Sequence, residues 1–290
     1  MKTLQIPFTL LCVLAISALS AHVTHASQLA TAKVISVEGT VTKHTTGDIK
    51  LNGLERQLKV GDILSEGDRL SSSAGSKAIL VFSNGSEITI SENTNVKLTE
   101  LKQEPYNSSQ TYEQLQADPS KSQTLLELDY GQLDGHVKKL SGTSSFMIKT
   151  SLGTAAIRGT RFSVSFTFSS GNLSLSINNL DGLVDFISQT TTTAEGEYVF
   201  DSGADITTTP IPPKGEASLD VSQENPVFNQ VVGALATLPG VDVEVSPDGN
   251  ITVTVDVPPV TNPNVDDPLP APVITPEDPG IIVVSPEDQG

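Results

Sequence analysis

Strict alternation of apolar and polar residues is the feature of this sequence that most restricts its fold. Residues 162–168 read Phe-Ser-Val-Ser-Phe-Thr-Phe, and Leu173, Leu175 and Ile177 repeat the period with serine between them. Successive side chains of a strand point to opposite faces, so a period of two gives one buried and one solvated face. We predict a three-stranded antiparallel meander over residues 162–186, with turns at 169–172 and at Asp181-Gly182.

The same signals extend over most of the chain. Short apolar runs separated by Gly, Asn, Asp and Ser continue from Lys33 to about residue 205, and Ala78–Phe82 is followed by the hairpin signal Asn84-Gly85. No stretch before residue 220 has a helical period. Turn signals recur about every 8–12 residues, which predicts an all-β, antiparallel β-rich domain, either a sandwich or β-solenoid-like. Residues 103–123 are polar and turn-rich, and we expect an insertion loop there with a short helix near Tyr112.

The composition changes near residues 205–215. We predict a linker over residues 206–224, followed by a helix plus β-hairpin element over residues 225–257. Residues 258–290 contain nine prolines and should form a flexible, disordered tail, because such a stretch cannot build a regular core.

The formal net charge of −17 is unevenly distributed. All 17 basic residues lie before residue 215 together with 21 of the 34 acidic ones, and the remaining 13 acids follow without a base. The charge excludes simple electrostatic capture of nucleic acid or of an anionic membrane, since phosphate repels such a surface. Weak calcium binding by the acidic tail stays an alternative.

The N-terminus has the pattern of a secretory signal. Lys2 precedes the apolar run 10–16, which is too short for a bilayer span, and Thr24-His25-Ala26 has small residues at the −3 and −1 positions. We predict a signal peptide over residues 1–26 with cleavage after Ala26; cleavage after Ala21 and an uncleaved anchor are the alternatives. The mature chain would then lack cysteine and any membrane span, and would be periplasmic, extracellular or at the cell surface.

The mature chain offers little chemistry for catalysis. It keeps only His44 and His136, lacks cysteine for a usual zinc site, and has no G-x-S-x-G element. The acidic pairs Glu127/Asp129 and Asp181/Asp185 have no spacing that favours a glycosidase over solvated strand and turn residues. We therefore predict no catalytic, cofactor-binding or metal-binding residues, and an unrecognised hydrolase is the least favoured class.

One segment carries a family resemblance. Residues 146–164 read FMIKTSLGTAAIRGTRFSV and resemble the signature of FecR-type domains, in which T-x-x-G precedes [VI]-R-G-T and F-x-V. Residues 60–64 and 66–70 resemble the paired G-D turns of these domains, 78–86 their hairpin, and 130–133 and 180–184 the turns around the signature. The resemblance covers residues 34–187 of a domain predicted at 33–205. The matching positions are Gly61, Asp62, Gly67, Asp68, Gly85, Gly131, Thr150, Gly153, Arg158, Gly159, Thr160 and Phe162.

The residues themselves suggest structural roles. Gly159 should mark a bulge or tight bend. Arg158 should clamp a buried carboxylate or loop carbonyls, with ligand contact as the alternative. Asp62 and Asp68 should accept backbone N–H bonds in turns rather than act in catalysis.

The resemblance also implies a function. Named members of the family are membrane regulators with a cytoplasmic anti-sigma segment, a transmembrane helix and a periplasmic FecR domain that receives a signal. This sequence shows no such cytoplasmic segment and no second apolar span, so the resemblance implies an exported β-module that interacts with an envelope or surface protein. The alternative is a structural or matrix component whose tail binds calcium or spaces the domain from a surface.

Overall fold

The computed structural model describes residues 28–45, 56–169, 171–192, 198–201, 203–247 and 249–255. Within these ranges the chain is mostly β-strand, with one α-helix and one 3-10 turn. This confirms the all-β prediction. The predicted signal peptide, Ala26 and the predicted tail lie outside the described residues.

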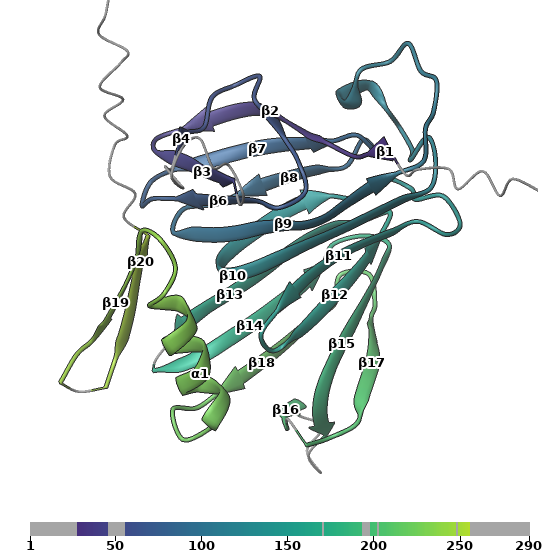
Figure 1. Ribbon diagram of the computed structural model, residues 1–290. Helices are drawn as coiled ribbons and strands as arrows, with labels where there is room; N and C mark the ends of the chain where they lie inside the picture. The colour runs from purple at the N-terminus through teal and green to yellow at the C-terminus, as the bar shows by residue number, and fades with distance from the viewer. Residues whose placement is uncertain are drawn as a thin grey trace, which may run out of the picture.

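Apart from a separate two-stranded sheet of β19 and β20, the described strands form two sheets, here called sheet A and sheet B (Figure 1). Sheet A runs β4-β3-β6-β9-β10-β11-β12-β15-β17, with β1 beside β9 and β16 beside β15. Sheet B runs β5-β2-β7-β8-β10-β13-β14-β18. The strands of sheet A are β1 (Gln28–Leu29), β3 (Val41–Thr45), β4 (Arg56–Gln57), β6 (Asp68–Ser72), β9 (Thr94–Gln103), β10 (Ser122–His136), β11 (Ser145–Thr150), β12 (Gly153–Arg158), β15 (Leu183–Thr192), β16 (Tyr198–Phe200) and β17 (Ile206–Ile211). Those found only in sheet B are β2 (Ala32–Glu38), β5 (Ile63–Leu64), β7 (Lys77–Phe82), β8 (Glu87–Ile90), β13 (Arg161–Ser169), β14 (Asn172–Asn179) and β18 (Glu216–Val221).

The long strand β10 belongs to both sheets. Its first part pairs with β9 and β11 in sheet A, and from Gly131 onward it pairs with β8 and β13 in sheet B. Gly131 has a φ of 104°, and a Cβ there would lie 2.5 Å from the Cα of Thr94. Only glycine therefore fits where the strand leaves one sheet for the other.

Alternating side chains of the two sheets meet in one core. Phe82 of sheet B and Phe146 of sheet A pack edge to face at 5.7 Å between ring centroids. Phe162, Val164 and Phe166 of β13 are all fully buried, as their alternation with serine and threonine predicts.

The structure corrects the predicted meander. β13 and β14 pair as expected, but β15 does not pair with β14; it pairs with β12, β16 and β17 in the other sheet. The neighbour of β14 on its second side is β18. The turn at Asp181-Gly182 is a crossing between sheets, which periodicity cannot distinguish from a hairpin.

The structure also corrects the predicted linker at 206–224, because β17 and β18 lie there. β18 reads Glu-Ala-Ser-Leu-Asp-Val and buries Ala217, Leu219 and Val221. The prediction of a linker relied on the sharp change in proline content and charge and therefore missed this regular alternation. The predicted antiparallel arrangement has one exception among the described strands, the parallel pairing of β10 with β11.

Helix α1 (Pro226–Leu235) and a hairpin of β19 (Val241–Val245) and β20 (Ile251–Val255) follow. Asn225 caps the helix, since its side-chain oxygen accepts the N–H of Val227 at 3.0 Å. Phe228 packs edge to face on Phe168, which in turn stacks on Tyr130. The helix therefore joins the core of the sheets.

Residues 104–121 connect β9 to β10 without a strand, and a 3-10 turn occupies Tyr112–Gln114. In the described part of the chain no helix has the length and apolar character needed to cross a membrane.

Candidate interaction face beside the signature

The two G-D turns have the same geometry. The carboxylate of Asp62 accepts the N–H of Lys59 at 3.0 Å, and that of Asp68 accepts the N–H of Ser65 at 2.8 Å. Gly61 and Gly67 precede them with φ values of 92° and 91°. Each aspartate thus closes its own turn through a backbone N–H, the geometry that the sequence predicts for a turn-stabilising residue.

The two aspartates differ in burial. Asp68 is 1% exposed, pairs with Lys43 at 2.8 Å and accepts the hydroxyl of Thr45 at 2.7 Å. Asp62 is more open and pairs with the exposed Arg56 at 3.3 Å. Neither lies near a cluster of metal-ligating side chains, since the described residues contain no such cluster.

Residues of the signature build a double crossing between the sheets, here called the corner (158–161 and 179–183). The first segment carries the chain from β12 to β13, and the second carries it back from β14 to β15. The buried hydroxyl of Thr160 donates to Asn179 Oδ1 at 2.8 Å, and a Cβ on Gly182 would lie 2.5 Å from the carbonyl oxygen of Gly159. The two segments therefore fix one another.

Asp181 and Arg161 close the corner on its outside. The N–H of Arg161 donates to Asp181 Oδ1 at 2.7 Å, and its guanidinium donates to Oδ2 at 2.9 Å. Both hydrogen bonds lower the pKa of the Asp181 carboxyl. The backbone N–H of Arg161 has the larger effect and its guanidinium the second largest. Asn179 completes the corner by donating to the carbonyls of Gly182 at 3.1 Å and Ile211 at 2.8 Å.

Neither Asn179 nor the role of Asp181 was predicted from the sequence. The available signal was an asparagine at the end of a strand, directly before Leu-Asp-Gly.

Arg158 lies at the edge of the corner with its side chain exposed. Its Nη2 donates to the carbonyl of Ser144 at 2.9 Å. The sequence suggested that Arg158 binds either a buried carboxylate or loop carbonyls, and the structure shows it bound to a loop carbonyl.

The other signature positions are spread over the domain. Thr150 shapes the β11–β12 turn, where its hydroxyl accepts the N–H of Leu152 at 3.2 Å and donates to the carbonyl of Gly153 at 3.1 Å. Gly85 has a φ of 84° in the β7–β8 turn, and Phe162 is 1% exposed in the core. These positions do not converge on one site.

Beside the corner, sheet A has an exposed surface that we call the signature face (Met147, Ala156, Arg158, Leu183 and Asp185). Strand register places Met147, Ala156 and Asp185 in one row and Arg158 beside Leu183 in the next. Leu183 is 65% exposed. These residues, with Ser145, Phe146 and Ile157, line a mostly apolar hollow of about 290 Å³.

A second hollow, of about 280 Å³, lies on the same sheet near the β11–β12 turn. Leu152, Ile187, Phe200 and Ile206 contribute its apolar lining.

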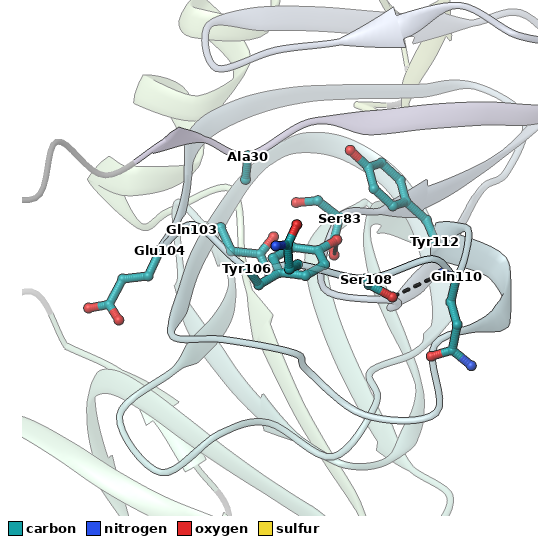
Figure 2. A pocket seen from close by; sticks show the side chains of 9 residues that line it. Ala30, Ser83, Gln103, Glu104, Tyr106, Ser108, Gln110 and Tyr112 are labelled. Carbon is teal, nitrogen blue, oxygen red and sulfur yellow. Dashed lines mark hydrogen bonds between the residues drawn. The ribbon is translucent and has the colours of Figure 1, made fainter.

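A third hollow, of about 260 Å³, lies under the loop 104–121 (Figure 2). Its lining is mostly polar, and its two tyrosines hold the loop to the sheets. Tyr106 donates its hydroxyl to the carbonyl of Ser83 at 2.9 Å, and Tyr112 shares a hydrogen bond with Thr31 at 3.0 Å. Figure 2 shows Glu104 and Gln110 extending away from Tyr106, so the polar groups do not converge.

The acidic pairs considered for catalysis are largely engaged in ion pairs. Glu127 pairs with Lys149 at 3.4 Å, Asp129 pairs with Arg69, and Asp181 pairs with Arg161. Burial raises the pKa of Asp129 against the opposing effect of Arg69. His136 lies at the surface between Glu87 and Arg161 on neighbouring strands. Desolvation of its imidazole, followed by the charge of Lys138, lowers the pKa of His136.

Part of the chain is similar to a known protein family. Residues 68–184 match the family model described as FecR protein. No curated protein matches the sequence. Two crystal structures, at 2.50 and 1.65 Å, of a "putative anti-sigma factor" from Parabacteroides distasonis ATCC 8503 each align with 65% of this chain and 99% of their own at 9% identity. Their TM-score of 0.31 is too low to support an argument about fold or function.

Proposed function

We propose that this chain is an exported, non-enzymatic module of the cell envelope that receives a signal or holds an assembly together by binding another protein, because residues 68–184 match the FecR family model. FecR domains belong to regulators, which supports interaction rather than catalysis. The N-terminal sequence pattern supports export.

The signature face is the observation that carries this proposal. Most signature residues are engaged in turns, crossings and core, whereas Leu183 is 65% exposed beside Arg158. An exposed apolar side chain over a hollow of about 290 Å³, with one cation and one anion at its rim, has the composition of a small protein-binding surface.

The test is capture of envelope proteins by the full chain and by two variants. Leu183→Asp should abolish capture of a specific partner, because it places a charge on the apolar hollow. Val245→Asp changes a side chain of similar exposure, 62%, on the distant strand β19 and should leave capture intact. Unchanged melting temperatures would show that both variants fold. Capture of the same partner by the Leu183→Asp variant would refute this role for the face.

The alternative, a structural or matrix component, is supported by the 13 acids and no bases after residue 214. Calcium titration of the full chain and of a chain ending at Val255 separates the two functions. Calcium binding that requires residues 256–290, together with partner capture that requires them too, would favour the matrix component.

A further inference from the structure

Strand β17 is an uncharged sheet edge. Among the described strands it pairs only with β15, over six consecutive residue pairs from Val184↔Ile211 to Gln189↔Ile206 without a bulge. Its sequence is Ile-Thr-Thr-Thr-Pro-Ile, and five of the six residues are exposed or half-buried. Figure 1 shows it at the outer side of β15.

Two other edges of the sheets carry charge. β18, the last strand of sheet B, contains Glu216 and Asp220, and the two-residue strand β4 contains Arg56. Charged residues and short length are the usual devices that prevent an edge from pairing with another chain. β17 has neither device, and Pro210 alone limits pairing at one end.

The solvent-facing face of sheet A at β17 also offers an apolar contact. Thr207 and Ile211 face inward, because they lie opposite the buried Ser188 and Val184, so Ile206 and Thr208 face outward. Ile206 is 71% exposed and borders the hollow of about 280 Å³ that Ile187 and Phe200 also line.

The charges around this edge are mainly negative. Asp185, Asp201 and Asp205 are exposed on or beside it. Lys149, which lines the hollow, is engaged with Glu127, and Lys214 follows β17 in the next turn. A segment that pairs with β17 would therefore be favoured by basic flanks.

We propose that β17 accepts an extended segment of a partner protein as an added strand, and that this segment has an uncharged, β-branched centre flanked by lysine or arginine. Main-chain hydrogen bonds would supply the contact and the flanking charges the selectivity. The proposal rests on the proposed function, since it names how the partner binds to sheet A.

A second copy of this chain fits the edge less well. In an antiparallel pair of two β17 strands centred on Thr208, each Pro210 would lie opposite Ile206 of the other copy. Each proline lacks the N–H that the ladder uses. Each copy would also bring the same acidic flanks to the interface.

The test uses the full chain and three synthetic heptapeptides. Lys-Thr-Val-Thr-Val-Thr-Lys is the probe, the same peptide with glutamate at both ends is the charge control, and a version with proline at the centre is the strand control. We expect the lysine peptide to bind at least tenfold more tightly than either control and to slow amide hydrogen exchange at residues 206–209.

Three variants make the result specific. Thr208→Lys should weaken the lysine peptide at least tenfold by charge repulsion. The double variant Asp185→Lys, Asp205→Lys should reverse the preference toward the glutamate peptide. Thr254→Lys, on an exposed position of β20, should change nothing. A general loss of structure would not reverse a charge preference.

Equal binding of all three peptides, exchange protection elsewhere than β17, or dimerisation lost in Thr208→Lys would each overturn the proposal. Capture of the cellular partner separates this proposal from the proposed function. If Leu183→Asp abolishes capture while Thr208→Lys does not, the signature face binds the partner and strand addition is wrong. If both variants capture the partner, strand addition and the role proposed for the signature face are both wrong, whereas failure of the unmodified chain to capture any specific partner would refute the proposed function itself.

Discussion

Single polar residues in this domain stabilise turns by accepting hydrogen bonds from backbone N–H groups. The two G-D turns show that the contribution of such a residue to the free energy of unfolding depends on its burial. Asp62 and Asp68 each accept the N–H of the residue three positions earlier. The turns themselves were predictable from sequence, because Gly-Asp after a short apolar run has few other conformations. Their different burial was not, because it depends on the pairing of β3 with β6, two strands that are separated in the sequence.

Replacing these aspartates by alanine should therefore give unequal losses of stability. Asp68→Ala leaves Lys43, which is only 15% exposed, without its partner, so we expect a loss of about 3–5 kcal/mol. Asp62→Ala removes a surface pair and one turn bond, for which about 1 kcal/mol is expected. Urea unfolding of both variants measures the difference, and equal losses would contradict the assignment of Asp68 as a buried ion-pair partner.

At the scale of elements, the crossings between sheets decide the topology. The alternation in β13 and β14 predicts their burial and pairing correctly, because both are local properties. The placement of β15, β17 and β18 was not predictable, because a turn such as Asp181-Gly182 has the same residues whether it returns to the same sheet or crosses to the other. What distinguishes the crossing is a contact far along the chain, the close approach of Gly182 to Gly159.

Gly131→Ala tests the strand switch in β10. The added Cβ would overlap Thr94, with 2.5 Å to its Cα, in a conformation already unfavourable for alanine. We expect at least 3 kcal/mol of destabilisation or failure to fold, from overpacking added to the left-handed backbone. Gly75→Ala is the matched control: its φ is 68° with nothing within 4 Å of the Cβ, so about 1–2 kcal/mol is expected. Similar melting temperatures for the two variants would refute the claim that only glycine fits where β10 passes from one sheet to the other.

The loop 104–121 should loosen in acid. The backbone N–H of Glu113 and then the ammonium of Lys33, 2.9 Å away, lower the pKa of the Glu113 carboxyl from 4.5 to about 2. A carboxyl with a depressed folded pKa contributes its stabilisation fully above its unfolded pKa and loses it as the pH falls through the folded value. We expect the Tyr112 ring resonances to change between about pH 4.5 and 2.

Carbon NMR titration of the Glu113 carboxyl checks the cause of this shift. Lys33→Met should raise the pKa of Glu113 toward its ordinary value. Lys77→Met, which removes the unrelated pair with Glu38, should leave the pKa unchanged. An unchanged pKa in Lys33→Met would show that the ion pair does not hold the loop.

At the scale of the whole molecule, the composition boundary near residues 205–215 is not a boundary of the core. β17 is a strand of sheet A and β18 is a strand of sheet B. Phe228, Val231 and Leu235 of α1 belong to the same hydrophobic cluster as Phe166 and Leu219. The change in charge and proline content affects the exposed residues of these elements, whereas their apolar residues extend the core. We therefore expect residues 28–255 to unfold in one cooperative transition.

Phe228→Ala provides the decisive measurement. Phe228 is 2% exposed and its ring lies 5.4 Å from that of Phe168, which stacks on Tyr130 at the junction of the two sheets. Removing a buried phenylalanine should cost about 3–5 kcal/mol. If the helix is part of the core, calorimetry should show one transition shifted to lower temperature. If it is a separate unit, a small early transition should appear while the main one stays in place. Val227→Ala, at a half-buried position on the same helix, controls for truncation of an apolar side chain on this helix and should shift the single transition by much less.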